Sequence, residues 1–233
     1  MTPIPPADRD PSGHDVVVCL KWVPISPEID PLTGVVTTDQ RFRGLSPADR
    51  TALEWALRIA EVGGGSVTAV SLGTDDAEAG LREALAHGAS AAARVAAAQP
   101  DQLTSRAVAR ALAPSCGPAS LVLCGDHSLD RGSGSVPAFL AAELGLGQAL
   151  GCIRLETTAD GAVVRPLVAE RRLDQGRRER LAITGPAVLS FEGGLELRRA
   201  PLGPAIESAD VAIPVVQPAP VDEPGGRSTS VSV

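Results

Sequence analysis

Aromatic side chains are scarce in this chain of 233 residues: they make up 2% of the sequence, and tyrosine is absent. A platform on which bases or sugars stack is therefore not expected. Positive charge is also in deficit, with 21 Lys and Arg against 28 Asp and Glu and a formal net charge of −7. Because nucleic-acid binding by counterion release needs clustered Lys and Arg, nucleic acid is not an expected partner.

Cysteine and histidine are few and scattered. Cys19, Cys116, Cys124 and Cys152 have no metal-type spacing and form no redox pair, so reduced structural thiols are expected. The three histidines have no metal-type spacing either, and no metal is predicted. Long apolar runs are missing, and the first 14 residues lack the apolar core of a signal peptide. We expect a soluble cytoplasmic protein with no membrane insertion.

Several sequence signatures of catalysis are absent as well. There is no G-x-x-x-x-G-K-[ST] loop, no G-x-G-x-x-G after the first predicted strand and no S-G-G-x-D-S adenylation loop. His127, Ser128 and Asp130 are close in sequence, but no G-x-S-x-G nucleophile elbow is present. These absences argue against nucleotide hydrolases, dehydrogenases and hydrolases that use a nucleophilic serine, and we predict no catalytic residue.

What the sequence does contain is an alternation of short apolar runs with helical patterns. The runs at 16–20, 67–72, 91–97 and 121–124 are predicted strands. The helical patterns between them begin near Ser46, Thr74 and Asp101. This order requires crossovers between parallel strands. The predicted fold class is α/β: a doubly wound, mostly parallel, Rossmann-like sheet with helices on both faces.

Proline and glycine suggest how this domain is bounded. Residues 1–14 are predicted to be a disordered tail, and 15–202 form the α/β domain. Pro24, Pro27, Pro31 and Gly34 within 21–45 predict a surface excursion without a long helix. Turn residues at 160–161 and 174–176 predict an antiparallel hairpin extension over 150–191, with strands at 163–168 and 186–191. The prolines beyond Gly203 predict a C-terminal arm, 203–233, without regular structure.

The segment from Gly125 to Val136 is the best candidate for a binding site. It is a turn rich in Gly, Ser and Asp that joins a predicted buried strand to a helix. Gly132 and Gly134 can adopt positive φ, and the unpaired N–H groups at the helix start favour an anion. A helix terminus contributes only about 0.3–1 kcal/mol, against roughly 4 kcal/mol for millimolar affinity. Other parts of the chain must therefore help to hold any nucleotide.

Several blocks of the sequence resemble the electron transfer flavoprotein β subunit family. They lie at 18–24, 46–54, 69–73 and 81–89, and the glycine turn follows the family's G-x-x-x-x-D-x-x-x-G-x-V with Gly125, Asp130, Gly134 and Val136. The segments 172–179 and 186–188 resemble the family's signature hairpin and its following strand. The resemblance covers about 15–206. The Ala- and Arg-rich composition is similar to that of paralogues associated with mycofactocin-dependent oxidation.

The resemblance implies a heterodimer. Its α subunit holds most of the redox FAD, while the β chain carries AMP, or in some branches a second FAD, in a pocket of its own. Carried over to matching positions, the cofactor-binding residues would be Cys19, Ser46, Pro47, Ala48, Asp49, Leu72, Gly125, Asp126, His127, Asp130, Gly132, Ser133, Gly134, Ser135 and Val136. The ends of parallel strands at Leu20, Leu72 and Cys124 should meet where open α/β sheets bind ligands. This supports three of these zones independently of the resemblance.

The resemblance also implies that a loop after the last strand anchors an electron-donating dehydrogenase, with Arg198, Arg199 and Leu202 as docking residues. Some positions depart from the family: the usual Asn and Phe of N-P-F are Ser46 and Ala48, and the Lys after the first glycine of the turn is Asp126. A lost Lys and an added Asp make the local potential less favourable for phosphate. The alternative is a stand-alone nucleotide-sensing protein resembling universal stress proteins.

Overall fold

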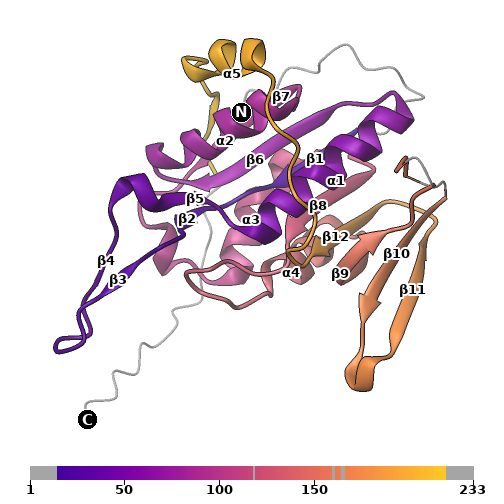
Figure 1. Ribbon diagram of the computed structural model, residues 1–233, viewed down its shortest axis with the longest axis horizontal. Helices are drawn as coiled ribbons and strands as arrows, with labels where there is room; N and C mark the ends of the chain where they lie inside the picture. Colours follow the sequence, from indigo (N-terminus) through magenta and orange to yellow (C-terminus); the bar gives the residue numbers. More distant parts are fainter. Residues whose placement is uncertain (1–14, 118, 159–160, 164–165, 219–233) are drawn as a thin grey trace.

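The computed structural model describes residues 15–117, 119–158, 161–163 and 166–218. Its centre is a nine-stranded sheet in the order β11-β10-β9-β12-β8-β1-β6-β7-β13 (Figure 1). Neighbouring strands from β12 to β13 in this order are parallel. The predicted strands at 16–20, 67–72, 91–97, 121–124 and 186–191 are confirmed as β1 (Val16–Cys19), β6 (Val67–Gly73), β7 (Ala91–Ala96), β8 (Leu121–Gly125) and β12 (Ala187–Phe191).

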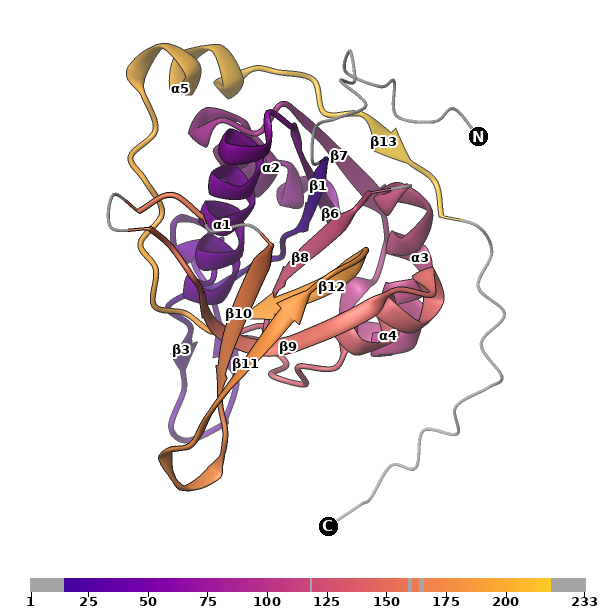
Figure 2. The same ribbon diagram turned by 90° about the vertical axis from the view of Figure 1, so that its right-hand side faces the viewer.

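Helices cover both faces of this sheet (Figure 2). Val16 and Val18 of β1 belong to the core under α1 (Pro47–Gly63) and α2 (Glu78–His87). Val17 and Cys19 point to the opposite face and pack with α3 (Ser105–Cys116) and α4 (Val136–Leu144). Successive side chains of a strand point to opposite faces, so a run that is buried throughout requires two helical layers. The predicted doubly wound α/β fold is confirmed.

Local sequence signals explain where the helices begin. Ser46 caps α1 and accepts a hydrogen bond from the amide of Asp49 at 3.0 Å, with Pro47 at the first helical position. The predicted start of α3 near Asp101 is wrong by one turn: a 3₁₀ turn, η3 (Pro100–Gln102), comes first, and Thr104 caps the helix. A second 3₁₀ turn, η2 (Asp75–Ala77), separates Thr74 from α2, and Thr74 makes no capping bond.

The antiparallel extension is present. β9 (Gly147–Leu155) runs parallel to β12 and antiparallel to β10 (Leu167–Arg172), which pairs with β11 (Arg178–Ile183). The turn between β10 and β11, η4 (Asp174–Gly176), lies where the sequence predicts it. The strand predicted from Val163 begins only at Leu167, and Asp160 of the other predicted turn lies outside the described residues.

The segment 21–45 contains no long helix, as predicted, but it does contain strands. β2 (Trp22–Pro24) pairs with β5 (Arg43–Leu45), and β3 (Glu28–Ile29) pairs with β4 (Val36–Thr37); η1 (Gln40–Phe42) precedes β5. Together they form an arm that projects from the domain, with the β3–β4 hairpin at its tip (Figures 1 and 2).

The prediction that the chain beyond Gly203 lacks regular structure is wrong. α5 (Leu202–Ala209) packs on α2, and β13 (Val215–Val216) extends the sheet beside β7. Pro204 is tolerated because it falls in the first turn, where its missing N–H would have no helical partner. The predicted N-terminal tail, 1–14, and the last part of the predicted C-terminal arm, 219–233, lie outside the described residues. Among the described helices, none has the length and apolar character needed to cross a bilayer.

Candidate functional site

A pocket opens where three neighbouring parallel strands end. The register pairs Cys19 of β1 with Val70 of β6 on one side and with Cys124 of β8 on the other, so the three strand ends lie at one edge of the sheet. The chain leaves β1 toward β6 and returns to the far side of β1 with β8, and this reversal is the usual ligand-binding position of open α/β sheets. The pocket has a volume of about 120 Å³.

The glycine turn forms one wall of this pocket. Gly132 and Gly134 both have φ of 61°, a left-handed conformation that other residues rarely adopt. The guanidinium of Arg131 donates to the carbonyl oxygens of Asp101 at 3.1 Å and Leu103 at 2.6 Å, which ties the turn to the segment before α3. Asp130 forms an ion pair with Lys21 at the end of β1. The turn is therefore held from both sides of the pocket.

The starts of two helices contribute to the pocket. Val136 and Pro137 open α4, and Ser105 opens α3; all three line the cavity. The side chain of Ser135 makes no capping bond to the first turn of α4, whereas Thr104 caps α3 through the amide of Ala107. The positive end of α4 therefore faces the cavity without a side-chain oxygen of its N-cap residue bound to it.

Asp49 lies at the base of the pocket. It is 5% exposed, and Ser46 donates its hydroxyl hydrogen to the carboxylate at 2.9 Å. Burial raises the pKa of Asp49 to about 7, although hydrogen bonds from Ser46 and from the amides of Lys21 and Gly125 oppose the shift. These contacts tie the first turn of α1 to the ends of β1 and β8.

Asp126, at the start of the glycine turn, is connected to the neighbouring strands. The Ser190 hydroxyl of β12 donates to its carboxylate at 2.8 Å and accepts from the amide of Gly151 in β9 at 2.9 Å. Through Ser190, Asp126 therefore couples the start of the glycine turn to the antiparallel extension. It also places a carboxylate in the pocket lining.

Most of the predicted cofactor-binding residues come together. Those that line the pocket are Cys19, Asp49, Leu72, Gly125, Asp126, His127, Ser133, Gly134 and Val136. Asp130, Gly132 and Ser135 belong to the same turn without lining the cavity, and Ser46, Pro47 and Ala48 form the start of α1. Ser46 and Ala48 are buried.

Sequence reasoning missed a second group of lining residues. Its members are Lys21, Pro100, Leu103, Ser105, Val108, Leu112 and Pro137. Several come from α3 and the segment before it, which reaches the pocket because it follows a strand next to β6. Lys21 directly follows a predicted strand end, and this was the one signal that could have identified it.

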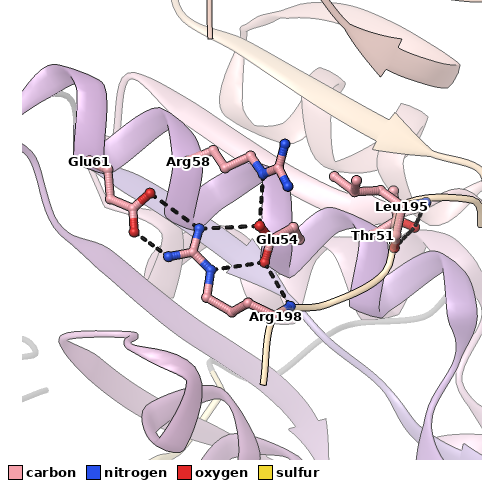
Figure 3. A network of polar contacts seen from close by, with 6 residues as sticks. All are labelled: Thr51, Glu54, Arg58, Glu61, Leu195 and Arg198. Carbon is pink, nitrogen blue, oxygen red and sulfur yellow. Dashed lines mark hydrogen bonds and ion pairs between the residues drawn. The ribbon is translucent and has the colours of Figure 1, made fainter. Parts of the chain in front are cut away.

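The predicted docking residues follow β12 in the chain. Arg198 lies on the segment between β12 and α5, which we call the docking arm and which runs past α1 (Figure 3). Arg198 does not project freely: its guanidinium and amide bond Glu54, and the guanidinium also bonds Glu61. These carboxylates, Glu61 first, raise the pKa of Arg198. Arg199 is exposed, and Leu202 at the start of α5 is 76% exposed. Arg198 thus fixes the arm, while Arg199 and Leu202 are accessible.

The fold and pocket define an α/β subunit with a ligand site at the carboxyl edge of a doubly wound sheet. The family model of the electron transfer flavoprotein domain matches residues 33–218, and the chain belongs to this family. It is 32% identical over 193 residues to an electron transfer flavoprotein subunit beta of Thermoanaerobacterium thermosaccharolyticum, covering 80% of this chain and 71% of that protein.

Two further relatives have the same extent of similarity. The protein FixA of Rhizobium meliloti is 32% identical over 203 residues, which cover 83% of this chain and 69% of that protein. The electron transfer flavoprotein subunit beta of Bacillus subtilis is 31% identical over 181 residues, which cover 76% of this chain and 68% of that protein. The chain is accordingly a β-type subunit with a role in electron transfer, in a family of electron carriers whose β subunits pair with α subunits. The alternative resembling universal stress proteins is not favoured.

Proposed function

We propose that the pocket holds an adenine nucleotide, either AMP or a second FAD, while the α subunit holds most of the electron-carrying FAD. The observation that carries this proposal is the convergence of three strand ends with a left-handed glycine turn and the uncapped start of α4. Each of these features favours a phosphate at the same place.

The lining divides into a polar and an apolar part. Backbone amides of the turn at 132–136 would bind the phosphate, with Lys21 and Arg131 as the lining cations. Leu72, Leu103 and Leu112 provide an apolar wall that suits an adenine ring. The carboxylates of Asp49 and Asp126 would stand close to the ligand, and the pKa of about 7 for Asp49 reduces its negative charge below neutral pH.

In this function, FAD supplies the one- and two-electron chemistry, and this chain contributes the pocket, the scaffold and a docking surface. We assign no catalytic residue to it. Leu202 and Arg199 would contact a redox partner dehydrogenase, and Arg198 would hold the arm that presents them. A heterodimer of this kind would work in the cytoplasm.

The proposal is tested by purifying the chain with its α subunit, denaturing the complex and identifying the released small molecules by mass spectrometry. We expect FAD together with AMP, or FAD in about twofold molar excess over the heterodimer. Gly134→Val places a side chain at a left-handed position, where a Cβ would lie 3.3 Å from the carbonyl oxygen of Asp126, and should reduce the β-chain nucleotide. A homodimer of this chain carrying ATP would overturn the proposal.

A further inference from the structure

The β3–β4 hairpin exposes apolar side chains along its whole length. Ile29 and Val36 are cross-strand partners and are 64% and 60% exposed. Leu32 and Val35 extend this surface to the tip, with Leu32 94% exposed. Ile25 and Phe42 are also exposed and continue it to the base, where the amide of Ile25 donates to the carbonyl of Phe42 at 2.8 Å. We call these six residues the hairpin surface.

The hairpin is held in shape by its own hydrogen bonds rather than by packing. The Asp30 carboxylate accepts from the amides of Leu32 at 2.8 Å and Thr33 at 3.1 Å. The Asp30 amide donates to Val35, and Gly34 has φ of 69° and donates to the Asp30 carbonyl. Such an Asx turn fixes the tip before any partner binds. A preorganised apolar element costs little entropy on binding.

The extent of the hairpin surface points to a permanent interface. Its six side chains expose apolar area on the order of a few hundred Å², the size of patch that marks interaction sites on soluble proteins. One partner in a standard interface buries about 800 Å², of which little more than half is apolar. The hairpin could therefore supply a large part of the apolar contact that a stable heterodimer needs.

The hairpin lies apart from the docking arm, the segment between β12 and α5 that carries Arg198 and Arg199. It leaves the sheet from the end of β1, the edge at which the pocket opens, and Lys21 links the two. Both views place it low in the picture and far from α5, which carries Leu202 and lies at the top (Figures 1 and 2). One partner that covers the pocket edge can reach this hairpin, whereas a dehydrogenase bound at α5 meets a different surface.

We propose that the β3–β4 hairpin is the apolar docking element for the FAD-carrying α subunit, an inference that rests on the proposed function. Permanent interfaces are more apolar than transient ones, which favours the α subunit over a dehydrogenase as its occupant. Ile29, Leu32 and Val36 would form the centre of the contact, because they combine the greatest exposure with adjacent positions.

The test is the affinity of the heterodimer, measured with the full chain and its cognate α subunit by sedimentation or titration. The triple variant Ile29→Thr, Leu32→Ser and Val36→Thr keeps β-branched residues in the strands, so the hairpin retains its conformation. We expect the dissociation constant to rise at least about a hundredfold. The matched control, Leu202→Ser with Ile206→Ser, removes equally exposed apolar side chains from α5 and should leave assembly unchanged.

Unchanged affinity in the triple variant would overturn the proposal. So would homodimerisation of the isolated wild-type chain that the triple variant abolishes, since the occupant would then be a second copy. Far-UV circular dichroism verifies the fold, and Leu32→Ser alone, at a residue 94% exposed, must weaken binding in the same direction. If wild type and control also form no complex with the α subunit, the proposed function fails instead.

Discussion

Gly125 shows how a single residue joins the strand ends to the pocket. A Cβ at this position would lie 2.7 Å from the Asp49 carboxylate and 3.0 Å from the Asp49 amide nitrogen. Gly125→Ala must therefore push the start of α1 away from β8, and we expect a loss of about 1–3 kcal/mol in the free energy of unfolding. Urea denaturation measures it. Gly185→Ala, where a Cβ meets nothing within 4 Å, is the control and should change little.

Asp49 should make stability depend on pH. Its pKa is about 7 in the folded protein and near 3.8 when exposed, so between these values the folded state binds more protons than the unfolded state. The contribution of Asp49 to the free energy of unfolding therefore decreases as pH rises from about 4 to 7. The slope is about 1.4 kcal/mol per pH unit where the folded state binds one full proton more than the unfolded state. Above about pH 7 the carboxylate is ionised in both states, so the contribution of Asp49 to the free energy of unfolding no longer changes with pH.

Asp49→Asn removes this titration, so its curve of unfolding free energy against pH should be flatter than that of wild type between pH 4 and 7. Chemical denaturation at several pH values measures both curves. Asp210→Asn, at an exposed carboxylate, provides the comparison and should follow wild type. Parallel curves for Asp49→Asn and wild type would show that the carboxylate is ionised throughout this range.

Residue-level patterns predicted part of the site because some of its contacts are local. The sequence predicts a helix start near Ser46, and Ser46 is the N-cap of α1. The contacts of Arg131 could not be predicted, because its partners Asp101 and Leu103 are about 30 positions away and meet it only after α3 and α4 pack together. Hydrophobic periodicity carries no information on such contacts.

At the scale of elements, the arm from β12 to α5 depends on α1. The hydroxyl of Thr51 accepts from the amides of Gly194 and Leu195, and Glu54, although 2% exposed, binds Arg58 and Arg198 (Figure 3). Burial opposes ionisation of Glu54, but hydrogen bonds from Arg198 and Arg58 outweigh it and lower its pKa. The carboxylate is thus charged and paired at neutral pH.

Glu54→Gln should release this arm. It removes the charge that Arg198 binds within the protein, and we expect a loss of about 2–3 kcal/mol together with faster amide hydrogen exchange over 192–201. Glu61→Gln breaks an ion pair at a side chain that is 58% exposed and should cost less than about 1 kcal/mol. Equal effects of the two substitutions would contradict a special role for Glu54.

The elements themselves were predictable where one principle dominated. Apolar runs identified β1, β6, β8 and β12, because parallel strands buried on both faces carry few polar side chains; β6 and β12 contain only Thr or Ser between their apolar residues. α5 was missed because prolines were taken to exclude helix, although Pro204 lies in its first turn. β3 and β4 were missed because two-residue strands are determined by the Asp30 turn rather than by a hydrophobic pattern.

At the scale of the whole molecule, α1 connects the surfaces to which we assign functions. Its first turn forms the base of the pocket through Asp49, and its middle binds the arm that leads to Leu202. The projecting β3–β4 hairpin, at the lower left of Figure 1, lies well apart from α5, at the top. A permanent partner at the hairpin and a transient one at α5 could therefore bind at the same time, as an electron relay requires.

Leu202→Ala should separate these two surfaces by experiment. Burying one leucine is worth about 1.5–3 kcal/mol, so docking of the dehydrogenase should weaken by roughly 10- to 100-fold while the heterodimer stays intact. Stopped-flow reduction of the flavin at increasing dehydrogenase concentration measures the docking constant, and sedimentation verifies assembly. Val62→Ala, an exposed apolar side chain on α1, should transfer electrons as wild type does. A docking constant unchanged by Leu202→Ala would place the dehydrogenase elsewhere and leave the exposure of this leucine without a function.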